Sequence, residues 1–151
     1  MSKVKLKKKQ KNLEFQEIYG FHSVSAALQN TKRKHFVLFI LEKYKELLLK
    51  WNKTHNLVSR KKTTNINEHI DDSLLISPFL RANIMDLGSG GGFPGIPIAI
   101  TNPKKKIYLV ERRQARAAFL LNTINQLELQ NTKVINVDSR DLKARDFNGP
   151  L

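Results

Sequence analysis

The sequence has no cysteine, no long apolar run and few acidic side chains. Without cysteine, neither a disulfide bond nor a thiolate metal site can form, and the four histidines lack ligand spacing, so we expect no metal. The longest apolar run, Phe36–Leu41, is too short to cross a bilayer, and the N-terminus has no apolar stretch suited to a secretory signal. These absences predict a cytoplasmic protein that does not interact with membranes. Its 151 residues suffice for one modest domain with a core.

Basic side chains outnumber acidic ones by 27 to 13, which gives a formal net charge of +14. A surplus of this size attracts polyanions, and nucleic acid is the partner that we expect first. Few aromatic residues stand among the basic clusters, which favours phosphate contacts on a structured target over base stacking. A lysine tail kept for solubility is the alternative for residues 1–12, but it explains the interior clusters less well. Those clusters are residues 32–34, 60–62, 104–106 and 112–113.

The segment Ile84–Gly95 is the most informative part of the chain. Its apolar start predicts a buried parallel strand that ends near Asp86, and its glycines allow the backbone to bend sharply against a ligand. A helix predicted from about Ile96 would offer its N-terminus to a carboxylate. Because Asp86 could meet a cationic amino group, the segment indicates a cradle for S-adenosylmethionine. The glycines expected at this ligand are Gly88, Gly90 and Gly92.

Two other interpretations of this segment remain open. Gly90, Gly92 and Gly95 have the spacing typical of dinucleotide-binding proteins, so an oxidoreductase that uses a nicotinamide or flavin cofactor is a second hypothesis. A glycine-rich turn without any ligand is a third. Asp86 favours S-adenosylmethionine because a dinucleotide has no cationic amino group for this carboxylate to meet.

A second acid follows a second apolar run, because the predicted strand Lys106–Val110 ends at Glu111. Glu111 lies roughly 20 residues beyond the glycines, the distance from which a carboxylate can hold both ribose hydroxyls. It could instead cap the helix that begins near Arg113, and the two roles are compatible.

The remaining pattern predicts an α/β fold, with about three parallel strands and an N-terminal helical cap. Phe36–Trp51 has apolar residues at helical intervals, and Ile66–Leu80 is a second helical region. Lys133–Val137 is the predicted third strand. The helix before it is expected to pack on the sheet through Ala117, Leu120, Leu121, Ile124 and Leu127. The predicted divisions are a basic extension (1–35), the helical cap (36–82) and the first half of the sheet domain (83–151).

Several short motifs recur together in one known family. They are Trp51–Asn52 with Asn56–Leu57, His69–Leu74, Asp86–Pro97, Phe119–Leu120 and Ser139–Arg140. Over about Leu38–Leu142 the chain resembles the bacterial small-subunit ribosomal RNA guanine-N7 methyltransferases, the family called RsmG or glucose-inhibited division protein B. The run Phe93–Pro97 is far more specific than a generic methyltransferase loop.

This resemblance implies a Rossmann-like class I methyltransferase sheet, S-adenosylmethionine as the cofactor and the small ribosomal subunit or its RNA as the partner. It implies no catalytic base, because guanine N7 attacks an activated methyl group without first losing a proton. The implied cofactor contacts are Gly88 and Phe93, Glu111 to the ribose, and the backbone of Asp141 and Leu142 to the adenine. Basic residues implied at the RNA or the site are Arg140, Arg112 and Arg113. The segment His69–Ser73 is expected to seal the cofactor pocket or to anchor the cap.

The chain also departs from the family pattern. It has Ala115 and Arg116 where the family commonly has two lysines, a loss for which Arg112 and Arg113 could compensate. Residues 1–35 do not look like the usual start of this family, and within them Ile18–Leu28 resembles the opening of SpoU-type ribose 2′-O methyltransferases. This resemblance favours a junction of two reading frames or a fused fragment over an amphipathic segment with a basic tail.

The family fold continues through more strands, so the strand before Gly88 is expected to have an open, apolar edge. We expect a monomer unless this edge pairs. A noncatalytic, truncated fragment that binds cofactor or RNA is therefore an alternative to the methyltransferase.

Overall fold

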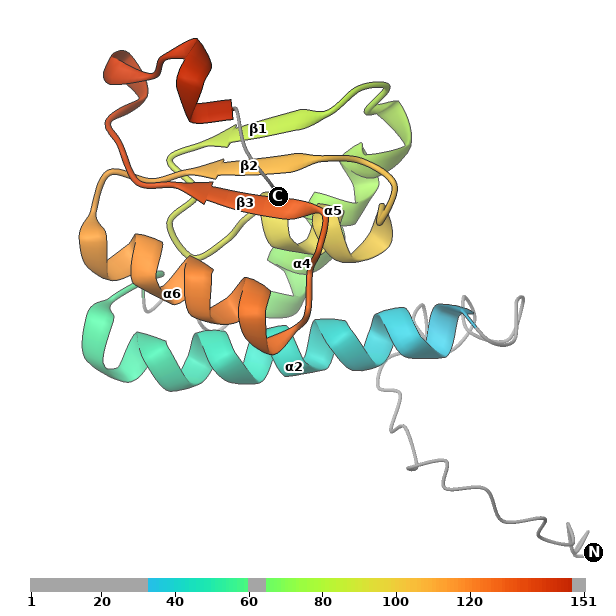
Figure 1. Cartoon of the computed structure of the whole chain (residues 1–151). Coiled ribbons are helices and arrows are strands. Elements are labelled where there is room, and N and C mark those ends of the chain that lie inside the picture. The colour runs from blue at the N-terminus through green and yellow to red at the C-terminus, as the bar shows by residue number, and fades with distance from the viewer. Residues whose placement is uncertain (1–32, 60–64, 148–151) are drawn as a thin grey trace, which may run out of the picture.

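The computed structural model describes residues 33–59 and 65–147 (Figure 1). Almost all of the extension predicted over 1–35, together with the basic cluster at 60–62, lies outside the described residues. Both predictions therefore remain predictions.

Three parallel strands form one sheet in the order β1, β2, β3 (Figure 1). The strands are β1 (Ile84–Leu87), β2 (Ile107–Val110) and β3 (Thr132–Ile135). They are short and rich in branched apolar residues, as expected for strands of a parallel sheet. The predicted partial α/β sheet is confirmed, although β3 ends two residues before the predicted Val137.

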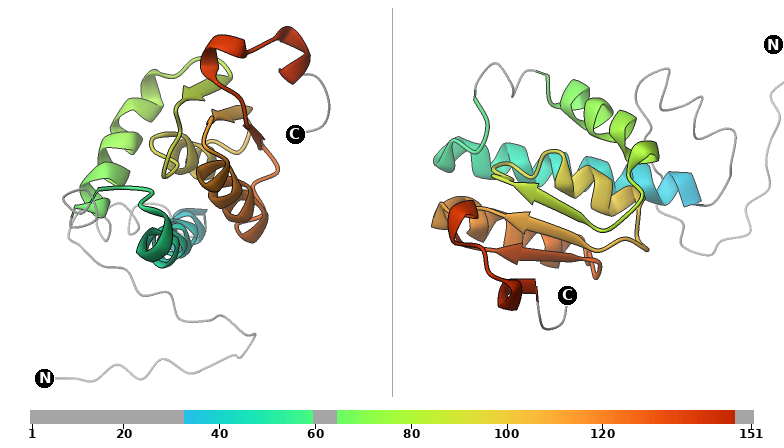
Figure 2. Two further views of the ribbon diagram at one scale, coloured as in Figure 1. Left: turned by 90° about the vertical axis from the view of Figure 1, so that its left-hand side faces the viewer. Right: turned by 90° about the horizontal axis from the view of Figure 1, so that it is seen from above.

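The longer helices lie mainly on one side of this sheet. They are α2 (Arg33–His55), α4 (Ile66–Ile76), α5 (Gly95–Thr101) and α6 (Gln114–Gln126). α5 and α6 contact the strands, α2 runs beneath both of these helices, and α4 packs against α5 (Figure 2). The second predicted helical region ends at Ile76, and the 3-10 turn η1 (Ser77–Phe79) with Pro78 follows.

One hydrophobic core joins the predicted cap to the sheet. From α2, Tyr44 and Leu48 are fully buried, and they belong to the same cluster as Ile96, Leu109 and Phe119. A spacing of four residues brings Tyr44 and Leu48 onto one face of α2, which is why this helix can pack along α5 and α6. The predicted division at residues 82 and 83 thus separates segments that share a core, and it stays a prediction.

The buried stripe of helix α6 and its C-cap agrees with the prediction at Ala117, Leu120 and Leu127 and differs from it at Leu121. Leu121, expected to pack on the sheet, is 45% exposed, so that expectation is wrong. Phe119 and Thr123 are fully buried instead, together with Leu120. The reason is that α6 contacts both β3 and α2, and this second contact turns the buried stripe away from Leu121.

Strand β1 is an edge of the described sheet, because it pairs only with β2 within the described residues. Met85 and Leu87 on this strand expose 46% and 55% of their surface. The expected open, apolar edge is therefore present. On the same side of the sheet the chain ends its described part at η3 (Ala144–Phe147), where the Phe147 ring lies 5.1 Å from the Tyr108 ring. In the described part of the chain no helix has the length and apolar character needed to span a membrane.

Candidate functional site

The loop between β1 and α5 depends on its glycines. Gly88, Gly90 and Gly92 have φ angles of 76°, 54° and 93°, in the left-handed region that favours glycine. The turn closes where the Gly92 amide donates to the Ser89 carbonyl at 2.6 Å. A side chain at any of the three positions would strain the backbone, so the predicted need for glycine is explained by conformation.

Helix α2 holds this loop from below. The buried Tyr44 hydroxyl donates to the Gly91 carbonyl at 2.6 Å, and a Cβ on Gly91 would lie 2.8 Å from Val58 Cγ1. Burial, with a smaller contribution from the negative charge of Asp86, raises the pKa of Tyr44 well above its ordinary value of 10.0. Tyr44 therefore stays protonated and remains a donor. The segment that follows α2 and the helix itself thus clamp the glycine loop.

Asp86 is buried beneath the same loop. Its Oδ2 accepts a hydrogen bond from the Gly95 amide at 3.1 Å, and the side chain is 9% exposed. Burial raises the pKa of Asp86 to about 6, a shift that the Gly95 hydrogen bond opposes and the charge of Glu111 reinforces. The anion at the start of α5 is therefore a side chain of the protein itself. The next amide, that of Ile96, donates to the Gly92 carbonyl. The first amides of this helix, which were expected to bind a ligand carboxylate, are therefore already hydrogen-bonded within the protein.

A cavity of about 410 Å³ opens at the carboxyl ends of the three strands. Parallel α/β sheets place their ligands at this end. Gly88 lies in its wall, and a Cβ built on Gly88 would meet no atom within 4 Å, so open space begins at this position. The cavity is lined by Leu87, Gly88, Val110, Glu111, Arg112, Arg113, Arg116, Val137, Asp138, Ser139 and Arg140.

Glu111 connects the glycine loop to the start of α6. The side chain is 4% exposed, Oε2 accepts from the Gly90 amide at 3.0 Å, and Oε1 accepts from the Arg113 amide at 2.8 Å. The expected contact with the beginning of the helix is thus present. Each carboxylate oxygen can accept a further hydrogen bond, Glu111 lines the cavity, and the ribose contact stays a prediction.

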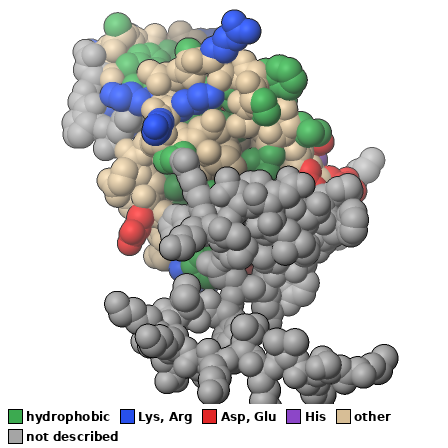
Figure 3. Space-filling model, turned by 90° about the vertical axis from the view of Figure 1, so that its right-hand side faces the viewer, with side chains coloured by type: hydrophobic (Ala, Val, Ile, Leu, Met, Phe, Trp, Pro, Cys, Tyr) green, Lys and Arg blue, Asp and Glu red, His purple; other side chains and the backbone are tan. Residues whose placement is uncertain are grey.

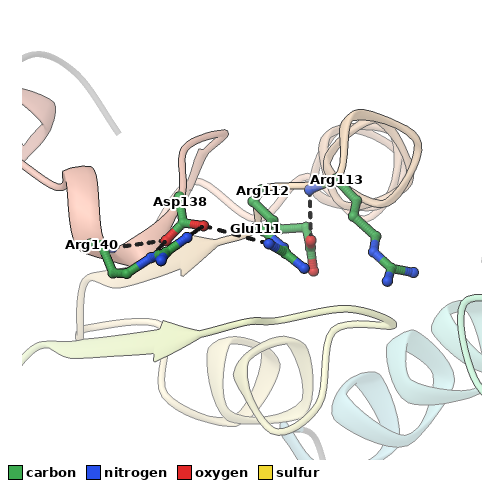
Figure 4. Close-up of polar contacts among 5 residues, drawn as sticks. All are labelled: Glu111, Arg112, Arg113, Asp138 and Arg140. Carbon is green, nitrogen blue, oxygen red and sulfur yellow. Dashed lines mark hydrogen bonds and ion pairs between the residues drawn. The ribbon is translucent and has the colours of Figure 1, made fainter.

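Asp138 organises the opposite wall (Figure 4). Its two oxygens accept from Arg140 Nε and Nη2, both at 3.0 Å, and Arg112 Nη1 lies 3.6 Å from Oδ2. These hydrogen bonds from Arg140 hold the pKa of Asp138 well below its ordinary value. Asp138 therefore stays ionised and keeps two arginines side by side at the rim.

The structure brings together five of the predicted site residues and leaves the others outside the cavity wall. Gly88, Glu111, Arg112, Arg113 and Arg140 line the cavity. Gly90 and Gly92 form the loop behind it, while Asp86 supports that loop from below. The Phe93 ring packs 5.5 Å from Tyr44 and 5.7 Å from His69. Asp141 and Leu142 follow Arg140 at the end of η2 (Ser139–Asp141) without lining the cavity. The cofactor roles given to all of these residues remain predictions.

Sequence reasoning missed two residues of the wall, Asp138 and Arg116. Asp138 follows the third strand as Glu111 follows the second, so an acid near a strand end was a usable signal. Arg116 entered only as a departure from the family pattern. Among the residues that the structure describes, no group of three or more His, Cys, Asp or Glu could hold a metal ion.

Comparisons with known proteins agree with this architecture. Residues 38–147 match the family described as GidB, rRNA small subunit methyltransferase G. The chain is 43% identical over 117 residues to the ribosomal RNA small subunit methyltransferase G of Helicobacter hepaticus, covering 76% of the chain and 60% of that protein. It is 48% identical over 96 residues to the Nitrosomonas europaea protein of the same description, covering 62% of the chain and 45% of that relative.

A third relative, the ribosomal RNA small subunit methyltransferase G of Histophilus somni, is 40% identical over 125 residues. That match covers 81% of the chain and 57% of the relative. The chain thus spans between 45% and 60% of the length of the relatives compared. With most of its length inside the match, the chain belongs to the GidB family, rRNA small subunit methyltransferase G.

Proposed function

We propose that this chain is part of an S-adenosylmethionine-dependent methyltransferase that acts on guanine N7 of small-subunit ribosomal RNA. The observation that carries the proposal is the cavity at the carboxyl ends of the strands, which both Gly88 and the buried Glu111 line. Family membership supports the reaction and the RNA substrate.

The residues present fit the cofactor. A volume of about 410 Å³ lies within the range of about 300–1,000 Å³ for small-molecule sites. Glu111 is fixed by the Gly90 and Arg113 amides, so its carboxylate is oriented before a ribose arrives. When bound, the cofactor supplies an activated methyl group. The chain has to hold that group and the guanine in line, which requires positioning rather than a general base.

The rim of the cavity fits an RNA phosphate. Arg112 and Arg140 are exposed, and both guanidinium groups lie within 3.6 Å of the Asp138 carboxylate. Guanidinium groups suit phosphate oxygens because they can donate two parallel hydrogen bonds. Lys and Arg side chains also gather on the face at the amino ends of the strands, opposite the cavity, so the positive surface extends beyond the site (Figure 3).

The noncatalytic alternative has support of its own. Within the described residues β1 pairs only with β2, so one edge of the sheet is open. The dinucleotide hypothesis has less support from the structure. A Cβ on Gly92 would lie 2.7 Å from Ile96 Cγ1, and one on Gly95 would lie 2.3 Å from Leu109 Cδ2, so both glycines serve contacts within the protein.

Calorimetry on the full chain tests the proposal. We expect saturable binding of S-adenosylmethionine and none of NAD. Glu111→Gln should weaken binding about tenfold or more, because a hydrogen bond to a charged group is worth about 1.5–3 kcal/mol. Glu46→Gln, at an exposed position of α2, is the matched control and should change little.

Methyl transfer from labelled cofactor to small ribosomal subunits then separates the two remaining functions. Transfer that depends on the chain supports the methyltransferase. Cofactor binding without transfer supports the noncatalytic fragment, and absence of binding to the folded chain contradicts both.

A further inference from the structure

Four arginines line the cavity, and they are not equivalent. Arg112 and Arg140 are both close to Asp138, so their charge is partly neutralised. Arg113 is exposed, and its side chain points away from the cluster around Asp138 (Figure 4). Arg116 is half-buried and lies one turn further along α6. It is the arginine whose position needs a separate explanation.

The Arg116 guanidinium lies against the glycine loop. Its Nη1 is 3.8 Å from the point that a Cβ on Gly90 would occupy, and its Nη2 donates to the Asn56 carbonyl at 3.5 Å. A guanidinium has five N–H donors, and this long contact uses one of them. Arg116 therefore holds donors beside the loop, at the cavity wall.

Glu111 and Arg116 meet the same short stretch of backbone. The Gly90 amide donates to Glu111 at 3.0 Å, while Arg116 Nη1 approaches the Cα side of Gly90. A ligand that places hydroxyl groups at Glu111 and an anionic group at Arg116 would thus be matched at both ends. The other site for an anion near this loop, the start of α5, is already taken by Asp86.

S-adenosylmethionine has this combination, a ribose diol and an amino-acid carboxylate. We propose that Arg116 binds the carboxylate of the methionine part, an inference that rests on the proposed function. Arg116 is then the residue that distinguishes the intact amino acid from analogues that lack its carboxylate.

Decarboxylated S-adenosylmethionine is the probe, because it keeps the sulfonium, the amino group and the ribose. Calorimetry compares both ligands on the wild-type chain, Arg116→Gln and the matched control Arg81→Gln, an exposed arginine that does not line the cavity. We expect Arg116→Gln to weaken S-adenosylmethionine binding about 10- to 100-fold, the effect of losing a charge-assisted hydrogen bond. The same variant should change binding of the decarboxylated ligand by less than about threefold, and Arg81→Gln should change binding of neither ligand by more than that.

The outcomes separate this inference from the proposed function. If the wild-type chain binds neither ligand, the proposed function fails. If the wild-type chain binds S-adenosylmethionine but Arg116→Gln weakens both ligands equally, or neither, the carboxylate contact is wrong. Arg116→Lys keeps the charge and should recover part of the preference for the carboxylate. Thermal melts without ligand verify that each variant is folded, and loss of RNA affinity alone in Arg116→Gln would overturn the inference.

Discussion

Replacement of Asp86 by asparagine tests what this buried carboxylate does. Asp86 is 9% exposed, and its Oδ2 accepts from the Gly95 amide at 3.1 Å. An asparagine oxygen can accept the same hydrogen bond without a charge. The substitution therefore removes the cost of a buried negative charge and leaves the link to the loop in place.

The magnitude follows from the pKa. Folding raises the pKa of Asp86 from 3.8 to about 6, so the folded state binds this proton more tightly than the unfolded chain does. The stabilisation is present at low pH and is lost as pH rises from about 4 to about 6, after which the free energy of unfolding no longer changes through this group. About two pKa units correspond to up to about 3 kcal/mol. At pH 7 we expect Asp86→Asn to raise the free energy of unfolding by about 1–3 kcal/mol.

Urea unfolding between pH 4 and pH 8 measures the free energy of unfolding of the wild type and of Asp86→Asn. Trp51 serves as the fluorophore because the chain has one tryptophan. The gain from Asp86→Asn should be small at pH 4 and reach its full size above pH 6. Asp72→Asn, at an exposed position of α4, is the control and should show no such window. A variant that is less stable than wild type at pH 7 would refute the reasoning.

The same variant examines the predicted cofactor contact. If the carboxylate faces the cationic amino group of S-adenosylmethionine, Asp86→Asn should lower affinity while it raises stability. If Asp86 serves only the loop, affinity should stay within about twofold of wild type. Binding and unfolding measured on one variant thus distinguish the two roles.

Two further predictions concern the support of the loop. Tyr44→Phe removes the donor to the buried Gly91 carbonyl and should lower the free energy of unfolding, measured in urea, by about 1–3 kcal/mol. The control is Tyr108→Phe, at a half-buried ring, which should lower it by less than about 0.5 kcal/mol. Equal effects of the two would contradict the role given to the Tyr44 hydroxyl. Gly95→Ala places a Cβ 2.3 Å from Leu109 Cδ2, so we expect a loss of about 1–3 kcal/mol or no folding in a thermal melt. An unchanged melting temperature would contradict this prediction, because it would mean that the core accommodates the added methyl group without loss of stability.

Local patterns predicted the elements well because their causes are local. Branched apolar runs became β1, β2 and β3, and the glycines adopted the left-handed angles that other residues avoid. Leu121 was predicted wrongly because its exposure depends on where α2 crosses α6, a tertiary contact that periodicity does not contain. The approach of Arg116 to Gly90 and Asn56 depends on the same packing.

The acids at the strand ends mark the limit of motif reasoning. A carboxylate before or after a glycine loop was interpreted as a ligand contact. In the structure, Asp86 accepts a hydrogen bond from the Gly95 amide, where the loop meets α5, and Glu111 accepts one from the Gly90 amide within the loop. Two buried carboxylates therefore hold the loop in shape before any ligand arrives, which reduces the ordering cost of binding. Loop support and ligand contact select the same residue types at the same spacing. A side chain can support the loop and also contact a ligand only if it lines the cavity and can form a further hydrogen bond. By this criterion Glu111, which lines the cavity, is better placed than Asp86, which does not.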